Sequence, residues 1–354
     1  MPAEAVRTAV FTAAVLTVTV VAGVLNYKGA APVAVFIVSG IALAGLAWVV
    51  AVATEAVGTR FGPAATGVLQ STLGNLPELF VVLFALGAGE VVVAKTSIVG
   101  SLLANALVVL GLVIIAGVRA SDERVMRFRA RLPNDTATLL FLAVFIIVLL
   151  GLSDTVGDRA SRHQVAISAI GAVFLLAVYG VWLWGYLRAE QREPALEQGG
   201  EHLLRFDIAV ALLALGGAGA AFVSDWFVNA LDPATKSLGI SKAFTGLVIV
   251  AIAGNAVENV AGIFLAAKGR ADHAVSVVIN SVSQIAVFLY PALVLLSLFF
   301  THRLTFVLGA VYIGALVLTA LAVWQITGDG EAYAFEGLAL IALYGIVAVL
   351  AFYE

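Results

Sequence analysis

Hydrophobic residues form long, nearly unbroken blocks along this chain, and polar residues collect in short segments between them. A helix needs roughly 20 apolar residues to cross the hydrocarbon core of a bilayer. Counted on that basis, the pattern predicts eleven membrane-spanning helices. They are expected at residues 6–25, 32–53, 64–87, 91–117, 137–152, 165–188, 206–229, 242–267, 272–299, 304–326 and 333–353. The stretch 137–152 is short and can extend in either direction.

The composition supports the prediction of a membrane protein and excludes some classes of function. Of 354 residues, 62% are hydrophobic and 12% charged, against roughly 45–50% and about 25% in soluble domains, and the mean hydropathy is +1.09. The predicted fold class is therefore an all-α polytopic membrane protein whose partner is the lipid bilayer. A net charge of −3 does not favour nucleic acid as a partner, and the absence of cysteine excludes disulfides and thiolate-bound metal.

Basic residues are distributed unequally between the two sides of the predicted topology. Twelve of the 19 lysines and arginines fall on the side of the N-terminus, and seven fall on the other side. Because loops rich in these residues stay in the cytoplasm, the N-terminus is expected to be cytoplasmic and the C-terminus outside. The first apolar stretch is interpreted as a retained span. The cell membrane is favoured over a vacuolar membrane because no long N-terminal tail or sorting segment is recognisable.

Two of the predicted spans contain the same polar pattern, a Gly-Asn pair with a glutamate three residues after the asparagine. A carboxylate inside the bilayer costs at least a few kcal/mol, so such residues usually mark an ion or proton pathway. In the first copy, glycine weakens the helix and Pro77 removes a backbone donor, which can free carbonyl groups toward a cavity. The two glutamates are therefore the main candidates for binding a transported cation or protons. The copies read Gly74-Asn75-Leu76-Pro77-Glu78 and Gly254-Asn255-Ala256-Val257-Glu258.

The two copies belong to an internal repeat. Glu258 follows Glu78 by 180 positions, and the same offset places the span 91–117 on 272–299 and Ser101 on Ser281. Each repeat then holds five spans, and an odd number makes the halves enter the membrane in opposite senses, as in many secondary transporters. The predicted organisation is an extra N-terminal span (1–29), a first inverted repeat (30–189), a cytoplasmic acidic linker (190–205) and a second inverted repeat (206–354).

Polar residues on the spans that follow each glutamate are candidates to complete an ion site. They recur at intervals of three or four residues, which places them on one helical face. Carboxylate, amide, hydroxyl and carbonyl oxygens suit calcium, and the lack of His or Cys in the set disfavours zinc or copper. Taken singly, an Asn or Ser in a span more often joins helices than binds an ion. The supporting set is Asn75, Asn255, Gly74, Gly254, Ser101, Asn105, Ser281 and Gln284, with Ser97 on the same face as Ser101.

Three further charged residues lie near predicted span ends. Glu55 and Asp225 end the spans that precede the two signatures, and they are expected either to line a vestibule or to lie at the membrane interface. Lys95 is the nearest basic residue that could pair with an intramembrane glutamate.

These motifs resemble those of the calcium/cation antiporter superfamily, and within it the calcium/proton exchanger (CAX) branch. The resemblance extends over both repeats, roughly residues 30–350. Sodium/calcium exchangers of the superfamily carry Gly-Thr-Ser before the Pro-Glu step, whereas both copies here have Gly-Asn, like the proton-coupled branch. The first signature comprises Thr54-Glu55, Gly67 to Glu78, Gly100-Ser101-Leu102-Leu103-Ala104-Asn105 and Val108-Val109-Leu110-Gly111. The second comprises Gly246, Gly254 to Glu258, Ser281 and Ser283-Gln284-Ile285-Ala286.

The resemblance implies a secondary transporter, not an enzyme, that exchanges calcium or a related divalent cation for protons by alternating access and needs no cofactor. Glu78 and Glu258 would form its midplane site. Sodium-coupled calcium exchange is the nearest alternative, and a cation channel is a remote one. The chain departs from the family pattern at Asn259 (usually His), Ala104 (usually Ser) and Asn280 (usually Gly). The missing histidine removes one proton-linked group.

Overall fold

The computed structural model describes residues 3–58, 73–190 and 205–354, most of which are helical. Within these ranges, nine helices are long and apolar enough to cross a membrane, and two shorter apolar helices lie at the Gly-Asn signatures. The predicted all-α polytopic fold is confirmed, although nine rather than eleven helices meet the length criterion in the described residues. The nine are Thr8–Tyr27, Pro32–Thr54, Val91–Ala120, Arg131–Val156, Arg159–Arg188, Phe206–Leu238, Ala271–Phe299, Ala310–Thr327 and Ala334–Tyr353.

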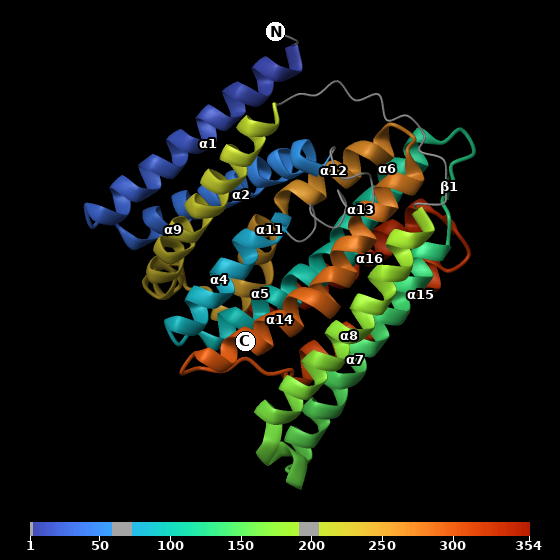
Figure 1. The fold of residues 1–354 in the computed structure, drawn as a ribbon. Coiled ribbons are helices and arrows are strands. Elements are labelled where there is room, and N and C mark those ends of the chain that lie inside the picture. The colour runs from blue at the N-terminus through green and yellow to red at the C-terminus, as the bar shows by residue number, and fades with distance from the viewer. Residues whose placement is uncertain (1–2, 59–72, 191–204) are drawn as a thin grey trace. The chain divides into compact units, whose positions relative to one another are not determined.

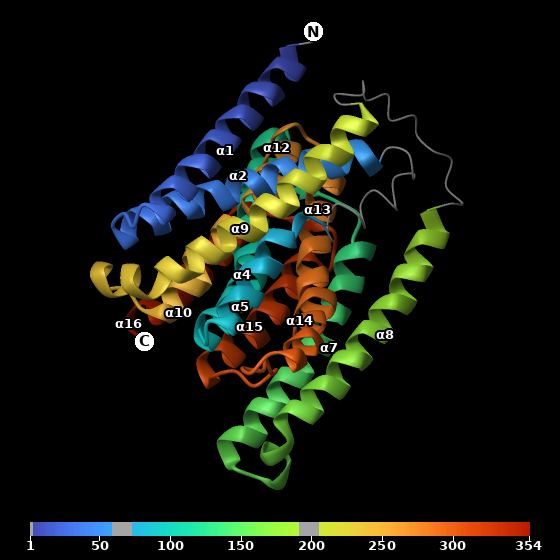
Figure 2. The ribbon, with the colours of Figure 1, turned by 60° about the vertical axis from the view of Figure 1, so that its left-hand side comes forward.

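The chain forms two compact units, each assembled from both halves of the sequence. Unit 1 is Met1–Phe84 with Val178–Gly239. It contains α1 (Ala3–Tyr27), α2 (Pro32–Gly58), α9 (Phe206–Leu238), most of α4 (Leu76–Gly87) and the end of α8 (Gln164–Glu190). Helices α1, α2 and α9 lie side by side (Figure 1, Figure 2). The stacked rings of Phe36 and Phe227, 4.6 Å apart, and close contacts at glycine hold this helical layer together.

Unit 2 is Ala85–Ala177 with Ile240–Glu354. Two of its spans each contain a π-helical turn, and a third such turn, η3 (Thr245–Val250), lies in the shorter helix Lys242–Gly254. One span is formed by α5 (Val91–Leu103), η1 (Ala104–Val109) and α6 (Leu110–Ala120), and the other by α13 (Ala271–Gln284), η4 (Ile285–Leu289), α14 (Tyr290–Leu296) and η5 (Ser297–Phe299). The remaining helices are α7 (Arg131–Val156), η2 (Arg159–His163), α10 (Lys242–Phe244), α11 (Ala251–Gly254), α12 (Ala256–Ala267), α15 (Ala310–Thr327) and α16 (Ala334–Tyr353).

Glycines allow the closest helix crossings in unit 2. A Cβ added to Gly100 on α5 would lie 2.2 Å from the carbonyl oxygen of Leu247 on η3. A Cβ on Gly111 of α6 would likewise lie 2.5 Å from the carbonyl oxygen of Gly337 on α16. Small residues at such points let the two backbones touch, which is how helices in membranes gain packing energy.

The 180-residue offset found in the sequence reappears in the local structure. Helices α4 and α12 start 180 positions apart and are both 12 residues long. Helices α5 and α13 begin at Val91 and Ala271, again 180 apart, after turns in which Gly89 and Gly269 adopt positive φ of 79° and 73°. The turns η1 and η4 also fall at corresponding positions. These elements of the two halves therefore repeat at the same spacing.

Three span predictions differ from the structure. The stretch 137–152 belongs to a longer helix, Arg131–Val156. Helix α9 continues to Leu238, so Asp225 lies well inside the helix and not at its end as expected. The predicted span 304–326 is wrong at its start, because α15 begins only at Ala310. Residues 300–309 form a non-helical segment in which Leu304 to Leu308 are nonetheless buried.

A short antiparallel ladder joins two loops of unit 2. Strand β1 (Met126–Arg127) pairs with β2 (Glu331–Ala332), with Met126 opposite Ala332. Arg127 forms ion pairs with Glu123 at 2.5 Å and Glu331 at 2.9 Å. All three side chains are solvent-exposed, so the pairs contribute little beyond joining the loops.

Candidate ion-binding site

Each Gly-Asn signature interrupts its helix at the asparagine. Helix α11 ends at Gly254, Asn255 has φ −105° and ψ 11°, and α12 begins at Ala256. At the first signature, Asn75 is likewise a turn residue between helical Gly74 and the start of α4 at Leu76. Pro77 is the second residue of α4, where the missing backbone donor is tolerated. Broken helices of this kind are tolerated at membrane depth where the freed backbone lines a cavity or is covered by protein.

A buried hydrogen-bonded cluster surrounds the second break, and all of it lies within unit 2. The Nδ2 of Asn255 donates to Ser101 Oγ at 2.8 Å and to the Ala251 carbonyl at 2.9 Å. The Nδ2 of Asn105 donates to Asn255 Oδ1 at 3.1 Å and to Ser281 Oγ at 2.9 Å. The four side chains are at most 1% exposed. The structure therefore brings together four of the eight supporting residues that the sequence singled out.

The orientation of both amides follows from one backbone group. The Ala251 carbonyl can only accept, so the amide atom facing it must be the nitrogen of Asn255. The oxygen of Asn255 then faces Asn105, which must offer its own nitrogen. Both N–H bonds of each amide are used, and the hydroxyls of Ser101 and Ser281 act as acceptors in equivalent roles. This fixed arrangement links spans from the two halves of the sequence.

The irregular turns of unit 2 lie beside this cluster. Asn105 is part of η1, and Gln284 is the last residue before η4. A π-helical turn changes the hydrogen-bond pattern of a helix and is often found at functional sites. Gln284 is 4% exposed, and its Oε1 has no hydrogen-bond partner in the part of the chain that is described. It is available as an oxygen ligand one turn from Ser281.

The first glutamate is buried in unit 1. Glu78 lies in the first turn of α4 and is 1% exposed, and Asn75 is 4% exposed. The N-terminal end of a helix favours a carboxylate, because the helix dipole and the unbonded N–H groups carry partial positive charge there. Glu258 occupies the corresponding position in the first turn of α12. The side chains of Glu258, Asn259 and Glu55 lie outside the described part of the structure.

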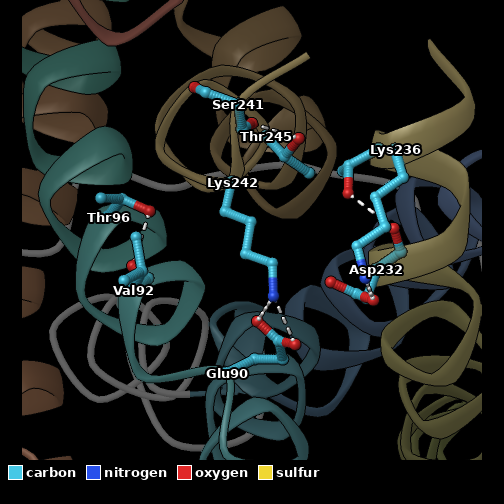
Figure 3. Close-up of polar contacts among 9 residues, drawn as sticks. Glu90, Val92, Thr96, Asp232, Lys236, Ser241, Lys242 and Thr245 are labelled. Carbon is cyan, nitrogen blue, oxygen red and sulfur yellow. Dashed lines mark hydrogen bonds and ion pairs between the residues drawn. The ribbon is translucent and has the colours of Figure 1, made fainter. Parts of the chain in front are cut away.

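Two basic residues have partners that the sequence did not predict. Lys95, considered as a partner for an intramembrane glutamate, donates to the Val307 carbonyl at 2.7 Å. Lys242 reaches from α10 to both oxygens of Glu90 at 2.8 Å, as Figure 3 shows. The signal for the second pair was present, since Glu90 and Lys242 both begin apolar helices. Their proximity depends on the crossing of α5 and η3, which hydropathy does not reveal.

The donor set of unit 2 is that of a hard cation. Among the described residues, no group of three or more His, Cys, Asp or Glu side chains could hold a metal ion. Amide and hydroxyl groups form this cluster, whereas Glu78 belongs to unit 1 and the side chain of Glu258 lies outside the described residues. Such sets favour calcium over softer metals.

Comparison with known proteins identifies a matching family and similar relatives. The family described as sodium/calcium exchanger protein matches residues 31–187 and 208–353. A Ca(2+)/H(+) antiporter of Synechocystis is 30% identical over 351 residues, which cover 93% of each chain. A vacuolar calcium ion transporter of Schizosaccharomyces pombe is 31% identical and covers 90% of this chain and 79% of its own.

Similarity to solved structures extends over nearly the whole chain. The structure of native YfkE superposes with a TM-score of 0.81 at 27% sequence identity, covering 98% of this chain and 99% of that one. The two segments matched by the family, 31–187 and 208–353, nearly coincide with the two repeats that the sequence predicts.

Proposed function

The chain belongs to the sodium/calcium exchanger protein family, and from that premise we propose that it exchanges calcium for protons across a membrane. Its relatives are transporters, and the chain is an integral membrane protein. Calcium as the cargo is supported by the names of the relatives and by the hard oxygen donors of the candidate site. Proton coupling is supported by the Gly-Asn form of both signatures.

The observation that carries the proposal is the burial of Glu78. A carboxylate 1% exposed in a short helix that begins at a break is costly unless its charge is balanced. The 180-residue repeat gives Glu258 the same place in α12. We infer that the two glutamates share one divalent cation and that Asn75, Asn255, Ser101, Asn105, Ser281 and Gln284 complete or orient the site. Gly74 and Gly254 would allow the breaks, and Glu55 and Asp225 would line the approach.

The charges at such a site explain why it would exchange calcium for protons and would not let either ion cross alone. Two carboxylates with one calcium ion are locally neutral, and so are two carboxylates with two protons. The empty site carries two negative charges, which are costly to occlude in a low dielectric. Occlusion is therefore favourable only with calcium or protons bound, and the two titrations are expected to be coupled. Alternating access then exchanges one cargo for the other.

Calcium uptake into proteoliposomes tests the coupling. We expect uptake driven by an imposed pH gradient in the absence of sodium, and none driven by a sodium gradient at fixed pH. Uptake only with sodium would assign the chain to sodium-coupled exchange. Electrogenic flux that requires neither gradient would identify a channel and refute the proposal.

We further propose that the N-terminus faces the cytoplasm of the cell. Within unit 2, the backbone N–H of Arg129 donates to Asp272 at 2.7 Å, which joins the arginine-rich loop 121–130 to the start of α13. Lys95 and Lys242 lie at starts of spans, away from that loop. An impermeant thiol reagent applied to intact cells should label Thr301→Cys and spare Arg124→Cys. The reverse pattern would invert the orientation.

A further inference from the structure

The segment 300–309 is an unusual part of unit 2. It is non-helical, yet Leu304 and Phe306 are fully buried and Thr305, Val307 and Leu308 are less than a tenth exposed. Buried backbone N–H and carbonyl groups need hydrogen-bond partners, and a non-helical segment does not supply them from its own backbone. The segment therefore needs specific partners from the surrounding spans.

Four side chains from four different elements supply those partners. They bind consecutive residues of the segment, alternating between its N–H and carbonyl groups. Leu304 N–H donates to Ser297 Oγ (2.9 Å), Tyr290 Oη donates to the Thr305 carbonyl (2.9 Å), Phe306 N–H donates to Ser168 Oγ (3.1 Å), and Lys95 Nζ donates to the Val307 carbonyl (2.7 Å).

Lys95 is the charged member of this set. Its ammonium also lies 3.4 Å from Thr305 Oγ1, and within the described residues no carboxylate lies within 4.0 Å of it. The acidic residue whose charge acts on it is Asp154, at the end of α7. The ammonium is thus held mainly by oxygens of the segment, and a charged donor makes the stronger kind of hydrogen bond.

The segment connects the two spans that carry the polar cluster. It follows η5 directly and is therefore continuous with the span that holds Ser281. Through Lys95 it is bonded to α5, six residues before Ser101, which is about 9 Å along the helix axis. We propose that Lys95 is a positioning residue, which locks segment 300–309 to α5 and so keeps Ser101 and Asn105 in register with Ser281.

This inference rests on the proposed function only for its effect on transport. The contact between Lys95 and segment 300–309 can be tested without any transported ion. Because the native chain has no cysteine, single cysteines report directly on accessibility. Val307→Cys is nearly isosteric, and it keeps the backbone carbonyl to which the lysine donates. In detergent, a maleimide should modify Val307→Cys at least tenfold more slowly than the exposed control Thr301→Cys. With Lys95→Met added, the two rates should converge, and with Lys95→Arg protection should persist.

Two controls keep the labelling test decisive. Ala143→Cys, which is buried in α7, must stay protected in the Lys95→Met background. If Ala143→Cys reacts with maleimide, the Lys95→Met substitution has loosened the whole fold. Tyr290→Phe then replaces Lys95→Met as the variant that should expose Val307→Cys. Two results would refute the proposal that Lys95 holds the segment against α5. One is rapid labelling of Val307→Cys with Lys95 intact, and the other is continued protection of Val307→Cys in the variant that keeps its fold.

Transport separates positioning from a purely structural role. Lys95→Met should raise the KM for calcium about tenfold or more, with a smaller loss in maximal rate, and Lys95→Arg should restore the KM. An unchanged KM in a Lys95→Met protein whose Val307→Cys is exposed would show that the segment does not position the site. If the wild-type protein does not exchange calcium, the proposed function fails, while the labelling result still decides whether the lock exists.

Discussion

Replacing Gly100 by alanine should strongly destabilise the protein, although alanine is the better helix former. The added Cβ would lie 2.2 Å from the carbonyl oxygen of Leu247, 2.5 Å from its Cα and 2.7 Å from its carbonyl carbon. All three are backbone atoms, so no side chain can rotate away. The same oxygen accepts a hydrogen bond from Tyr344 Oη at 3.0 Å, which separation of α5 and η3 would disturb.

The expected loss is the balance of three effects. Overpacking costs about 1–3 kcal/mol, and loss of a buried hydrogen-bond partner costs about 1–3 kcal/mol. Helix propensity returns about 0.8–1 kcal/mol when glycine becomes alanine. We therefore expect a net loss of about 1–5 kcal/mol in the free energy of unfolding.

Equilibrium unfolding in mixed detergent micelles, followed by circular dichroism, measures this change. Gly180→Ala is the matched control, because a Cβ at that position of α8 meets nothing within 4 Å. It should be neutral or slightly stabilising. If Gly100→Ala proves as stable as Gly180→Ala, the close crossing of α5 and η3 does not exist as described.

Three further predictions concern the polar cluster and the loops. Asn255→Asp removes both N–H donors of the side chain and sets an oxygen against the Ala251 carbonyl. It should therefore lower the free energy of unfolding by about 2–4 kcal/mol. Unchanged stability in a denaturant titration would contradict the assigned amide orientation. Asn259→His restores the residue usual in the family and should shift the pH profile of calcium uptake, and an unmoved profile would make that departure incidental. A hydrogen bond from Ser153 holds the pKa of the Asp158 carboxyl below its usual value. Its contribution to loop stability is therefore lost as the pH falls through that lowered pKa. The protection of the loop amides, measured as exchange relative to the intrinsic rate at each pH, should therefore fall at acid pH, and Asp158→Asn should abolish that change.

The membrane fold was predictable because hydropathy acts over whole spans. The two signatures were also predictable, since glycine next to asparagine disfavours a continuous helix, and both asparagines are indeed turn residues. The resemblance to calcium/proton exchangers is confirmed by the relatives and the matching structures. Ser101, Asn105 and Ser281 were identified from their spacing and do lie around Asn255.

What the sequence could not reveal depends on contacts between distant segments. The run Leu304 to Leu308 is as apolar as a helix, and only the side chains that bind its backbone, Lys95 among them, allow it to be extended. Lys95 thus binds backbone of the segment, and among the described residues it forms no ion pair with a carboxylate. The end of α9 was placed too early because hydropathy falls near Asp225, whereas the helix continues to Leu238.

The role of the paired glutamates is tested most directly by measuring calcium entry and proton exit together in proteoliposomes. Wild-type protein should release protons from calcium-loading vesicles in fixed proportion to the calcium taken up. Glu78→Gln and Glu258→Gln should each abolish both fluxes while leaving folding and yield intact, and Glu123→Gln, in an exposed loop, should leave both unchanged. Proton-coupled calcium exchange that survives in both signature variants would contradict the two-carboxylate mechanism.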